Sequence, residues 1–376
     1  MSENRNLRVG IIGCGAISRN HLEAFAAVDG AEVVAVCDID PVRAAAVARR
    51  HGVPTAFGSL AELLDHGVDL ISVCTPHPTH EDVVLTAAAA GVHVLCEKPI
   101  ATDLASAERM VTACDAAGVQ LGVLFQRRFW PAAQRMRGEL DNPEVGAPIL
   151  GQCSVLLHRD HTYYSRDAWR GTWLNDGGGV LMTQAIHYID LLQWLMGEVA
   201  EVYGRINTFK HGEHIEVEDS AVATLVFASG ALATIQATTA ATPALGARVQ
   251  ITGEHGGTVS LTEFPEGTDG RVDTFAVGQT ITAKPAHPAG VAPNADLSAI
   301  NGQLIPHHTA QVRDFVHAIK TGTDPSITGA GGTAALRILL AVYESARIGR
   351  PVRFADVDLP VVAPDSVSVQ PEPARA

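Results

Sequence analysis

Residues 7–18 read Leu-Arg-Val-Gly-Ile-Ile-Gly-Cys-Gly-Ala-Ile-Ser, an apolar run that leads directly into a glycine-rich turn. The run predicts a buried strand over 7–12, and a helix is expected over about 17–28. Glycines at 13 and 15 permit a tight turn and let the backbone approach a pyrophosphate, while the helix N-terminus supplies N–H donors. The stretch predicts a dinucleotide site formed by Gly13, Gly15, Ala16 and Ile17.

Asp38 strengthens this prediction. Ser18 stands where dinucleotide-binding turns carry a third glycine, so the glycine motif alone is weak. Asp38 ends a predicted strand over 32–37, where an acidic side chain accepts hydrogen bonds from the adenosine ribose hydroxyls. A carboxylate there would repel a 2′-phosphate, and no arginine directly follows it, so we expect NAD rather than NADP. Asp38 could instead be a turn former ahead of Pro41; Ile39 is expected in the cofactor site beside it.

Predicted strands and helices alternate through the first third of the chain. Such alternation implies parallel βαβ units, so residues 1–125 are expected to form an α/β dinucleotide-binding Rossmann domain. The further strands are predicted over 69–74, 92–96 and 119–124, and the helices over 41–51, 80–91 with Thr79 as its cap, and 103–117.

Beyond residue 126, strand-like runs follow one another with few helices between them. This pattern predicts an α+β domain over 126–355 with a large, mostly antiparallel open sheet. Residues 264–300 are rich in Gly, Pro, Thr and Asp and are expected to be a long loop, and 356–376 an extended tail. Strands are predicted over 155–157, 199–207, 220–227, 231–238 and 248–252, and helices over 182–196, 308–321 and 331–348.

Bulk composition excludes several classes of protein. The 376 residues are too many for one compact core and suit two domains. A net charge of -14 disfavours nucleic acid or an anionic membrane as a partner. The six cysteines form no C-x-x-C pair, so we expect reduced, buried thiols and no metal site. The N-terminus shows no signal peptide and no apolar run could span a bilayer, so a cytoplasmic location is expected.

Glu97-Lys98-Pro99 directly follows the predicted strand over 92–96. The carboxyl ends of parallel strands form the edge where open α/β sheets bind ligands. Thr75-Pro76 follows the preceding strand and ends at the same edge. These segments are expected to flank a nicotinamide, with Thr75, Pro76, Glu97, Lys98 and Gln126 in the cofactor site, joined by His80 unless it is an ordinary exposed histidine.

Three glycines, 177–179, precede an apolar helix that carries His187. The glycines let the backbone bend tightly or approach a ligand. Thr183, His187 and Asp190 share one face of the predicted helix. A histidine on a mostly apolar face is more often a satisfied core residue, so its role depends on the rest of the pattern.

These segments together resemble the glucose-fructose oxidoreductase / inositol dehydrogenase / MocA family. The resemblance covers about residues 7–353 and rests on the Gly-Cys-Gly turn, Glu97-Lys98-Pro99 and the Gly-Gly-Gly to His-x-x-Asp helix. It implies oxidation or reduction of a carbinol carbon of a sugar, cyclitol or related polyol with NAD(P). It also implies catalytic roles for Lys98 and His187, and a second domain that binds substrate and forms a homodimer or homotetramer.

The segment Trp169–Trp173 and the Gln-x-x-His helix narrow the resemblance to a sugar 3-dehydrogenase-like subgroup. Its members resemble enzymes that oxidise C3 of nucleotide-sugar acids, such as UDP-N-acetylglucosaminuronate 3-dehydrogenases, and similar enzymes act on glycosides. Many family members carry aspartate where this chain has Thr183, four residues before the histidine. A threonine hydroxyl can orient the imidazole but cannot make it more basic, as an aspartate would.

The chemistry requires hydride to leave carbon as the hydroxyl loses its proton. Either His187 accepts that proton while Lys98 stabilises the developing alkoxide, or Lys98 is itself the base. Substrate contacts are expected from Arg128, Phe129, Tyr164, Arg170, Trp173, Thr183 and His187. His307 and His308 could also reach the cleft, although capping or exposure is the stronger expectation for at least one of them.

Two other functions remain open. Tightly bound NAD could oxidise C3 transiently, which would acidify the C2 proton and allow elimination of an aglycone, making the protein a glycoside-cleaving enzyme. A non-catalytic, ligand-sensing regulator is the remote alternative, disfavoured because Lys98 and His187 are both present.

Overall fold

The computed structural model describes residues 5–166, 169–293 and 297–356. The chain forms two compact units, here called the first unit (Met1–Trp130 with Asp296–Thr333) and the second unit (Pro131–Ala295 with Ala334–Ala376). Residues 297–333, expected in the second domain, therefore pack with the first. The part of the predicted tail that follows Asp356 lies outside the described residues.

The first unit is built on a six-stranded sheet in the order β3-β2-β1-β4-β5-β6, with every neighbouring pair parallel. The strand order reverses between β1 and β4, and at such a switch point the carboxyl ends of the strands form a ligand crevice. This confirms the predicted Rossmann fold. The strands are β1 (Leu7–Ile12), β2 (Ala31–Cys37), β3 (Thr55–Phe57), β4 (Leu70–Val73), β5 (His93–Cys96) and β6 (Leu121–Val123).

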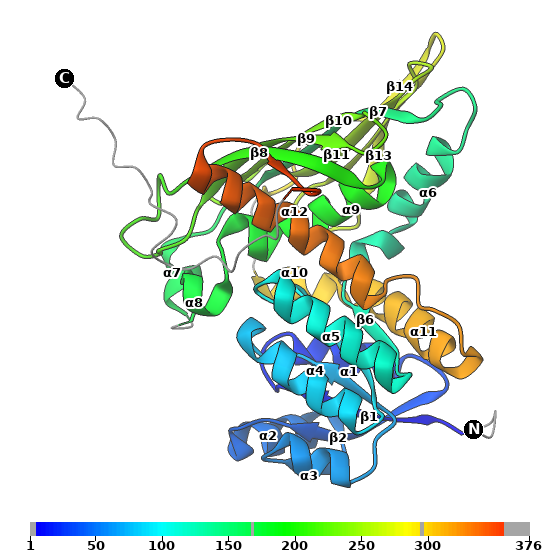
Figure 1. The fold of residues 1–376 in the computed structure, drawn as a ribbon, viewed down its shortest axis with the longest axis vertical. Helices are drawn as coiled ribbons and strands as arrows, with labels where there is room; N and C mark the ends of the chain where they lie inside the picture. The colour runs from blue at the N-terminus through cyan, green and yellow to red at the C-terminus, as the bar shows by residue number, and fades with distance from the viewer. Residues whose placement is uncertain (1–4, 167–168, 294–296, 357–376) are drawn as a thin grey trace. The chain divides into compact units, whose positions relative to one another are not determined.

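Helices cover the parallel sheet (Figure 1). They are α1 (Ser18–Ala26), α2 (Pro41–His51), α3 (Leu60–Asp65), α4 (His80–Ala89) and α5 (Leu104–Ala117), together with α10 (Leu297–Gln303) and α11 (Ile305–Thr321) from the later part of the chain. The late segment belongs to the first unit because Val312 and Phe315 of α11 are buried in the same core as Phe25 of α1. β3 and α3 were not predicted, since both are too short to show a periodicity.

The start of α4 differs from the expectation. Thr79 makes no side-chain capping bond to the helix. Its hydroxyl donates instead to the Pro76 carbonyl at 2.7 Å, inside a 3₁₀ turn over His77–Thr79. The predicted cap was wrong because Pro76 and Pro78 shape a turn ahead of the helix, and that turn provides a local acceptor for the hydroxyl.

The second unit is built on a nine-stranded sheet in the order β14-β13-β12-β11-β7-β10-β9-β8-β15. All neighbouring pairs are antiparallel except β10 with β7, which confirms the predicted, mostly antiparallel sheet. The strands are β7 (Pro148–Leu156), β8 (Val199–Asn207), β9 (Ser220–Phe227), β10 (Leu232–Thr238), β11 (Gly246–Gly253), β12 (Thr258–Glu263), β13 (Arg271–Val277), β14 (Thr280–Ala283) and β15 (Val352–Arg353).

The prediction of a long loop over 264–300 was wrong. β13 and β14 form an antiparallel hairpin in which Val277 pairs with Thr280. Gly278 occupies the turn with φ 58°, a left-handed conformation that favours glycine. The Gly- and Pro-rich composition of this range therefore reflects the turn of the β13–β14 hairpin and the segments on either side of it. α10 also begins inside this range.

Helices pack on the second sheet (Figure 1). They are α6 (Pro131–Leu140), α9 (Ile186–Met196) and α12 (Gly329–Ile348), and the short helices α7 (His161–Ser165) and α8 (Trp173–Asp176) belong to the same unit. Gly151 of β7 admits Met196 of α9, and Gly204 of β8 admits Val342 of α12, because a Cβ at either glycine would lie 2.2 or 2.7 Å from those side chains. Small residues in the strands thus let both helices approach the sheet closely.

All six cysteines are buried free thiols, as predicted. Among the described residues, no helix is both long enough and apolar enough to cross a membrane. The predicted homodimer or homotetramer stays a prediction.

Candidate functional site

The glycine turn has one closed side and one open side. Gly13 has φ 91°, and a Cβ there would lie 2.7 Å from the Cys74 carbonyl oxygen, so only glycine fits between β1 and β4. A Cβ at Gly15 would meet nothing within 4 Å, and Ala16 beside it is exposed. Ile17 is the residue before α1. The open side leaves the backbone accessible to a pyrophosphate at the helix N-terminus.

Ser18 closes the turn from within. It is buried, and its hydroxyl donates to the Gly15 carbonyl at 2.7 Å. A small side chain that is satisfied locally keeps α1 close to the sheet, which explains why serine can replace the third glycine. The departure from the glycine motif therefore leaves the geometry of the turn intact.

Asp38 is held rigidly at the end of β2. Its carboxylate accepts the Cys14 N–H at 2.8 Å and the Asp40 N–H at 2.9 Å. Arg43 of α2 places a guanidinium nitrogen 3.5 Å from the same carboxylate. Ile39, the next residue, is 95% exposed. The Asp40 contact is an Asx turn ahead of Pro41, as the turn-former alternative predicted, and the Cys14 contact also anchors the glycine turn. A ribose contact for Asp38 stays a prediction.

Arg43 makes Asp38 a sharp test of cofactor choice. Replacing Asp38 with serine should weaken NADH binding by about 10- to 100-fold, because charge-assisted hydrogen bonds to ribose hydroxyls are lost. The change also removes one of the two carboxylates near the Arg43 guanidinium, the other being Asp40 at 3.6 Å, so a 2′-phosphate meets less negative charge and NADPH binding should weaken less or improve. Fluorescence titration with both nucleotides measures the ratio. Glu32→Gln, at the other end of β2, is the charge-matched control, and an unchanged ratio in Asp38→Ser would refute the assignment.

His80 is wholly buried, so the interpretation of an ordinary exposed histidine was wrong. Its Nε2 lies 2.9 Å from the Thr75 carbonyl, and its Nδ1 lies 3.0 Å from the Pro99 carbonyl. Burial lowers the pKa of His80, while these backbone contacts act in the opposite direction. The ring thus ties together the loops that follow β4 and β5, which carry Thr75-Pro76 and Lys98-Pro99.

Glu97, Lys98 and Gln126 follow neighbouring strands of the parallel sheet. Glu97 is buried and its Oε2 accepts the Lys98 backbone N–H at 3.0 Å, while Lys98 itself is half-buried. Within the described part of the chain, Gln126 Oε1 and Thr75 Oγ1 are buried atoms with no hydrogen-bond partner. Buried polar atoms are normally satisfied. An amide-bearing ligand such as a nicotinamide would satisfy both atoms, so these residues fit NAD.

Each of the three glycines before the His187 helix has a distinct structural cause. Gly177 ends α8 with φ 77°, as a left-handed cap. A Cβ at Gly178 would lie 2.1 Å from the Tyr343 hydroxyl, and one at Gly179 would lie 1.7 Å from the Glu218 carbonyl oxygen. The glycines were expected to let a ligand approach closely. At these two positions the protein's own Glu218, which precedes β9, and Tyr343 of α12 occupy that space.

Glu218 caps the segment that leads to His187. Its carboxylate accepts N–H groups of Gly179 at 2.8 Å and Leu181 at 3.0 Å, and the Tyr343 hydroxyl at 3.0 Å. Burial raises the pKa of Glu218 to about 7, although these donors favour the ionised form. Sequence reasoning missed Glu218, because a lone glutamate before a strand carries no motif.

The predicted helix over 182–196 begins as a π-helical turn over Leu181–Ala185 and becomes α-helical from Ile186. Such turns are frequent at functional sites. Thr183 lies in the π turn, and its hydroxyl donates to the Gly179 carbonyl at 2.8 Å and contacts Gln184 Oε1 at 2.5 Å. His187 is 6% and Asp190 1% exposed. The expectation that Thr183 orients His187 stays a prediction.

A cluster of aromatic rings and guanidinium groups lies at α7 and the segment after it. Arg170 stacks over Tyr163, with 4.7 Å between guanidinium carbon and ring centroid, and at the same distance over Trp169. The Tyr163 hydroxyl accepts from Arg170 at 2.9 Å and from Gln184 at 2.9 Å. Tyr164 was predicted to contact substrate and Tyr163 was not. The sequence does not show which of two adjacent tyrosine rings faces the arginines.

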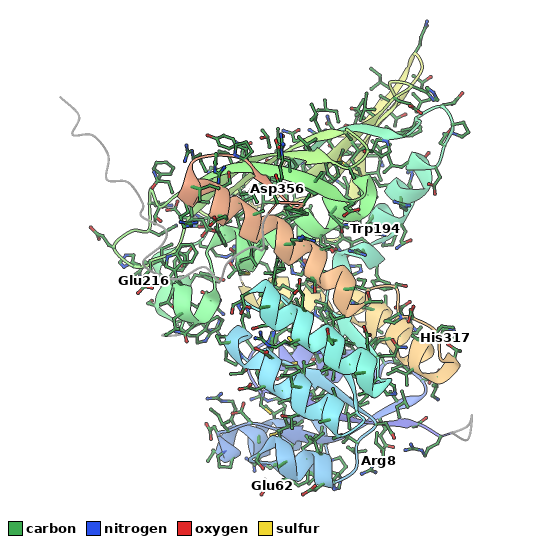
Figure 2. The ribbon with its side chains drawn as sticks, viewed as in Figure 1. Arg8, Glu62, Trp194, Glu216, His317 and Asp356 are labelled. Atoms are coloured by element: carbon green, nitrogen blue, oxygen red, sulfur yellow. The ribbon has the colours of Figure 1, made fainter. Side chains whose placement is uncertain are left out.

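The remaining predicted substrate residues differ in exposure. The Tyr164 hydroxyl bonds Thr239 at 2.9 Å and the ring is half-buried. Trp173 is buried, and its indole N–H donates at 3.1 Å to the carbonyl of Glu216, which Figure 2 labels. Arg128 is buried and Phe129 half-buried, in the 3₁₀ turn that begins at Gln126. A substrate role for each stays a prediction.

The candidate residues fall into both units. The cofactor candidates, Lys98, Arg128 and Phe129 belong to the first unit, and Tyr164, Arg170, Trp173, Thr183 and His187 belong to the second. The pairing of Lys98 with His187 in one site is therefore a proposal.

Comparison with known proteins gives consistent matches in both units. An oxidoreductase family model with an NAD-binding Rossmann fold, GFO/IDH/MocA, matches residues 7–125, and the C-terminal domain model of the same family matches residues 133–259. D-apiose dehydrogenase of Paraburkholderia graminis is 30% identical over 370 residues, which cover 95% of this chain and 92% of that protein. Myo-inositol 2-dehydrogenase of Thermotoga maritima is 27% identical, over 93% of this chain and 99% of that protein.

Among solved structures, the WlbA dehydrogenase from Bordetella pertussis, in complex with NADH and UDP-GlcNAcA, is similar to this chain. The two are 33% identical with a TM-score of 0.78, and the match covers 93% of this chain and 99% of that one.

Proposed function

Because the chain belongs to the GFO/IDH/MocA family of NAD-binding oxidoreductases, whose named members include dehydrogenases of sugars and cyclitols, we propose that it oxidises C3 of a pyranose with NAD. The observation that carries the proposal is the edge of the parallel sheet. There Lys98 follows β5, beside the orphaned polar atoms of Thr75 and Gln126 and the Asp38-anchored glycine turn. The 33% identity to a dehydrogenase solved with NADH and UDP-GlcNAcA supports a sugar-acid substrate, while the C3 position rests on the resemblance of Trp169–Trp173 and the Gln-x-x-His helix to sugar 3-dehydrogenases.

Lys98 is proposed to act on the reacting hydroxyl. An ammonium group in a half-buried position hydrogen-bonds that oxygen and stabilises its developing negative charge more strongly than it would in water. NAD, when bound, supplies the acceptor for the hydride. Glu97 fixes the backbone at Lys98 through the bond to its N–H, so the lysine stem starts from a defined point.

His187 is proposed to accept the hydroxyl proton as general base. The π turn and the Glu218 cap fix the start of its helix, and burial excludes competing water. Asp190 and Thr183 are proposed to orient the ring. Lys98 as the base is the alternative assignment within the same reaction.

The substrate is proposed to be a sugar acid, recognised by the Tyr163-Arg170 cluster. Aromatic faces suit the apolar face of a pyranose, and a planar guanidinium suits a carboxylate. Arg170 stacks between Tyr163 and Trp169, so its orientation is fixed before binding. Arg128, Phe129, Tyr164 and Trp173 are the further contact candidates.

A substrate screen with isotopic labelling tests the proposal. Purified protein with NAD is supplied with UDP-GlcNAcA, glucuronides, neutral glucosides, inositols and apiose, and NADH formation is followed. The expected result is fastest turnover with the sugar acid, and a primary isotope effect when C3, but not C2, carries deuterium. C3 oxidation would be refuted if deuterium at C3 left the rate unchanged while deuterium at C2 lowered it. Aglycone release without NADH accumulation would establish the glycoside-cleaving enzyme instead.

A further inference from the structure

Three side chains meet beneath Lys98, entirely within the first unit. Glu97 Oε1 lies 3.0 Å from His21 Nε2 and 3.8 Å from His308 Nε2. The two histidine rings contact edge to face, with centroids 5.6 Å apart. His21 comes from α1, Glu97 follows β5, and His308 lies in α11, so segments far apart in the chain converge here. All three residues are buried, and His307 is buried too, so the expectation that one of His307 and His308 would be exposed was wrong, while a capping role for one of them stays a prediction.

The hydrogen bonds of His21 are satisfied by a neutral ring. Its Nε2–H donates to Glu97, and its Nδ1, 2.7 Å from Ser72 Oγ, accepts the serine hydroxyl. Burial lowers the pKa of His21, and this outweighs the opposing effect of Glu97. Neutral His21 therefore gives Glu97 one donor but no positive charge.

His308 is in a different position. Its Nδ1 lies 2.9 Å from the Leu304 carbonyl, which can only accept, so Nδ1 carries a proton. If the ring were neutral, the Nε2 lone pair would face the Glu97 carboxylate, and among the described residues Nε2 has no hydrogen-bond partner. A second proton on Nε2 turns this repulsive contact into a buried ion pair at 3.8 Å.

Besides the adjacent Lys98, three further titratable groups lie near Glu97: the thiols of Cys74 and Cys96 and the imidazole of His80. Burial raises the pKa of the Cys74 and Cys96 thiols well above the usual value, so both stay uncharged. Burial lowers the pKa of His80. Burial alone would raise the pKa of Glu97, but its contacts with His21 and His308 hold it well below the usual range.

A metal ion bound by the same three atoms is the competing explanation, since they lie within 4.8 Å of one another. Two ligands of a tetrahedral zinc ion with bonds of about 2.0–2.1 Å lie about 3.3 Å apart. The His21–Glu97 distance of 3.0 Å is shorter than this and is that of a hydrogen bond, whereas the His308–Glu97 distance of 3.8 Å is longer. The geometry therefore favours a shared proton network.

We propose that His308 is a positioning residue for Lys98, with a proton on both ring nitrogens, so that Glu97 stays a carboxylate and holds the Lys98 backbone N–H. This rests on the proposed function, in which Lys98 contacts the reacting hydroxyl. Without the charge on His308, Glu97 would be a buried carboxylate held only by two neutral donors, the His21 ring and the Lys98 N–H, and it would take up a proton or turn away from Lys98. The lysine would then lose its fixed starting point.

Two spectroscopic measurements test the proposal without any substrate. In a ¹H–¹⁵N spectrum of the imidazole groups of the full-length protein near neutral pH, the signals lost in His308→Gln should be those of a doubly protonated ring. In the amide spectrum, the Lys98 N–H signal should shift in His308→Gln. His317→Gln, on the exposed side of the same helix (Figure 2), is the matched control and should leave Lys98 unchanged.

Kinetics supply the third readout. With the sugar identified by the screen, His308→Gln should lower kcat by about 10- to 100-fold, the loss expected for a charge-assisted contact, while the KM for sugar and the Kd for NADH change little. His308→Lys restores the charge and should recover part of kcat, which also covers the case in which the glutamine variant fails to fold.

Three results would overturn the proposal: a singly protonated His308, an unshifted Lys98 amide in both His308 variants, or stoichiometric metal in the purified protein. If no sugar reduces NAD, the proposed function fails, yet the two spectra still decide the role of His308.

Discussion

Replacing Lys98 with methionine is expected to lower kcat/KM for the sugar by about 10²- to 10³-fold. Methionine keeps an unbranched stem but removes the ammonium group that is proposed to stabilise the alkoxide. The Kd for NADH should change by less than about tenfold, because Asp38 and the glycine turn, which are proposed to hold the adenosine and pyrophosphate, are untouched. Steady-state kinetics and fluorescence titration measure the two quantities.

The control for Lys98 is Lys320→Met, an exposed lysine at the end of α11 in the same unit. It should turn over at the wild-type rate. Full activity in the Lys98 variant would remove the lysine from the mechanism and leave His187 as the sole proton-handling group. An equal loss of NADH binding and turnover would assign Lys98 to cofactor binding alone.

Replacing Gly179 with alanine is expected to prevent stable folding of the second unit. The new Cβ would lie 1.7 Å from the Glu218 carbonyl oxygen, a backbone atom at the end of the segment before β9. Neither side can yield without breaking the bond between Glu218 and the Gly179 N–H, which is 2.8 Å long. A loss of more than about 4 kcal/mol is expected, seen as little soluble protein or a Tm lowered by about 10 °C or more.

Gly138→Ala is the matched control for this prediction. Gly138 lies inside α6 of the same unit, and a Cβ there would meet nothing within 4 Å. Alanine is the better helix former, so this change should raise stability by about 0.5–1 kcal/mol. A Gly179→Ala protein with a wild-type Tm would show that the segment around Glu218 can move away.

The first unit was largely predictable because its signals are local. A buried parallel strand is a short apolar run, and the glycine turn, Asp38 and Glu97-Lys98-Pro99 each follow such a run directly. The parallel connection then brings their ends to one edge of the sheet. The hairpin β13–β14 was missed because its composition resembles that of a loop and its partner strand, β12, was not recognised either.

The sequence by itself determined the Rossmann fold, the family, NAD as the cofactor and the identities of Lys98 and His187 as candidates. Only the tertiary structure decided what surrounds them. The contacts of Glu218 with Gly179, Tyr163 with Arg170, and His308 with Glu97 join residues 39, 7 and 211 positions apart. In each pair one partner, namely Glu218, Tyr163 or His308, belongs to no motif. The physical reason is that periodicity reports which face of an element is buried, whereas hydrogen bonds and charge pairs in the interior depend on which elements pack together.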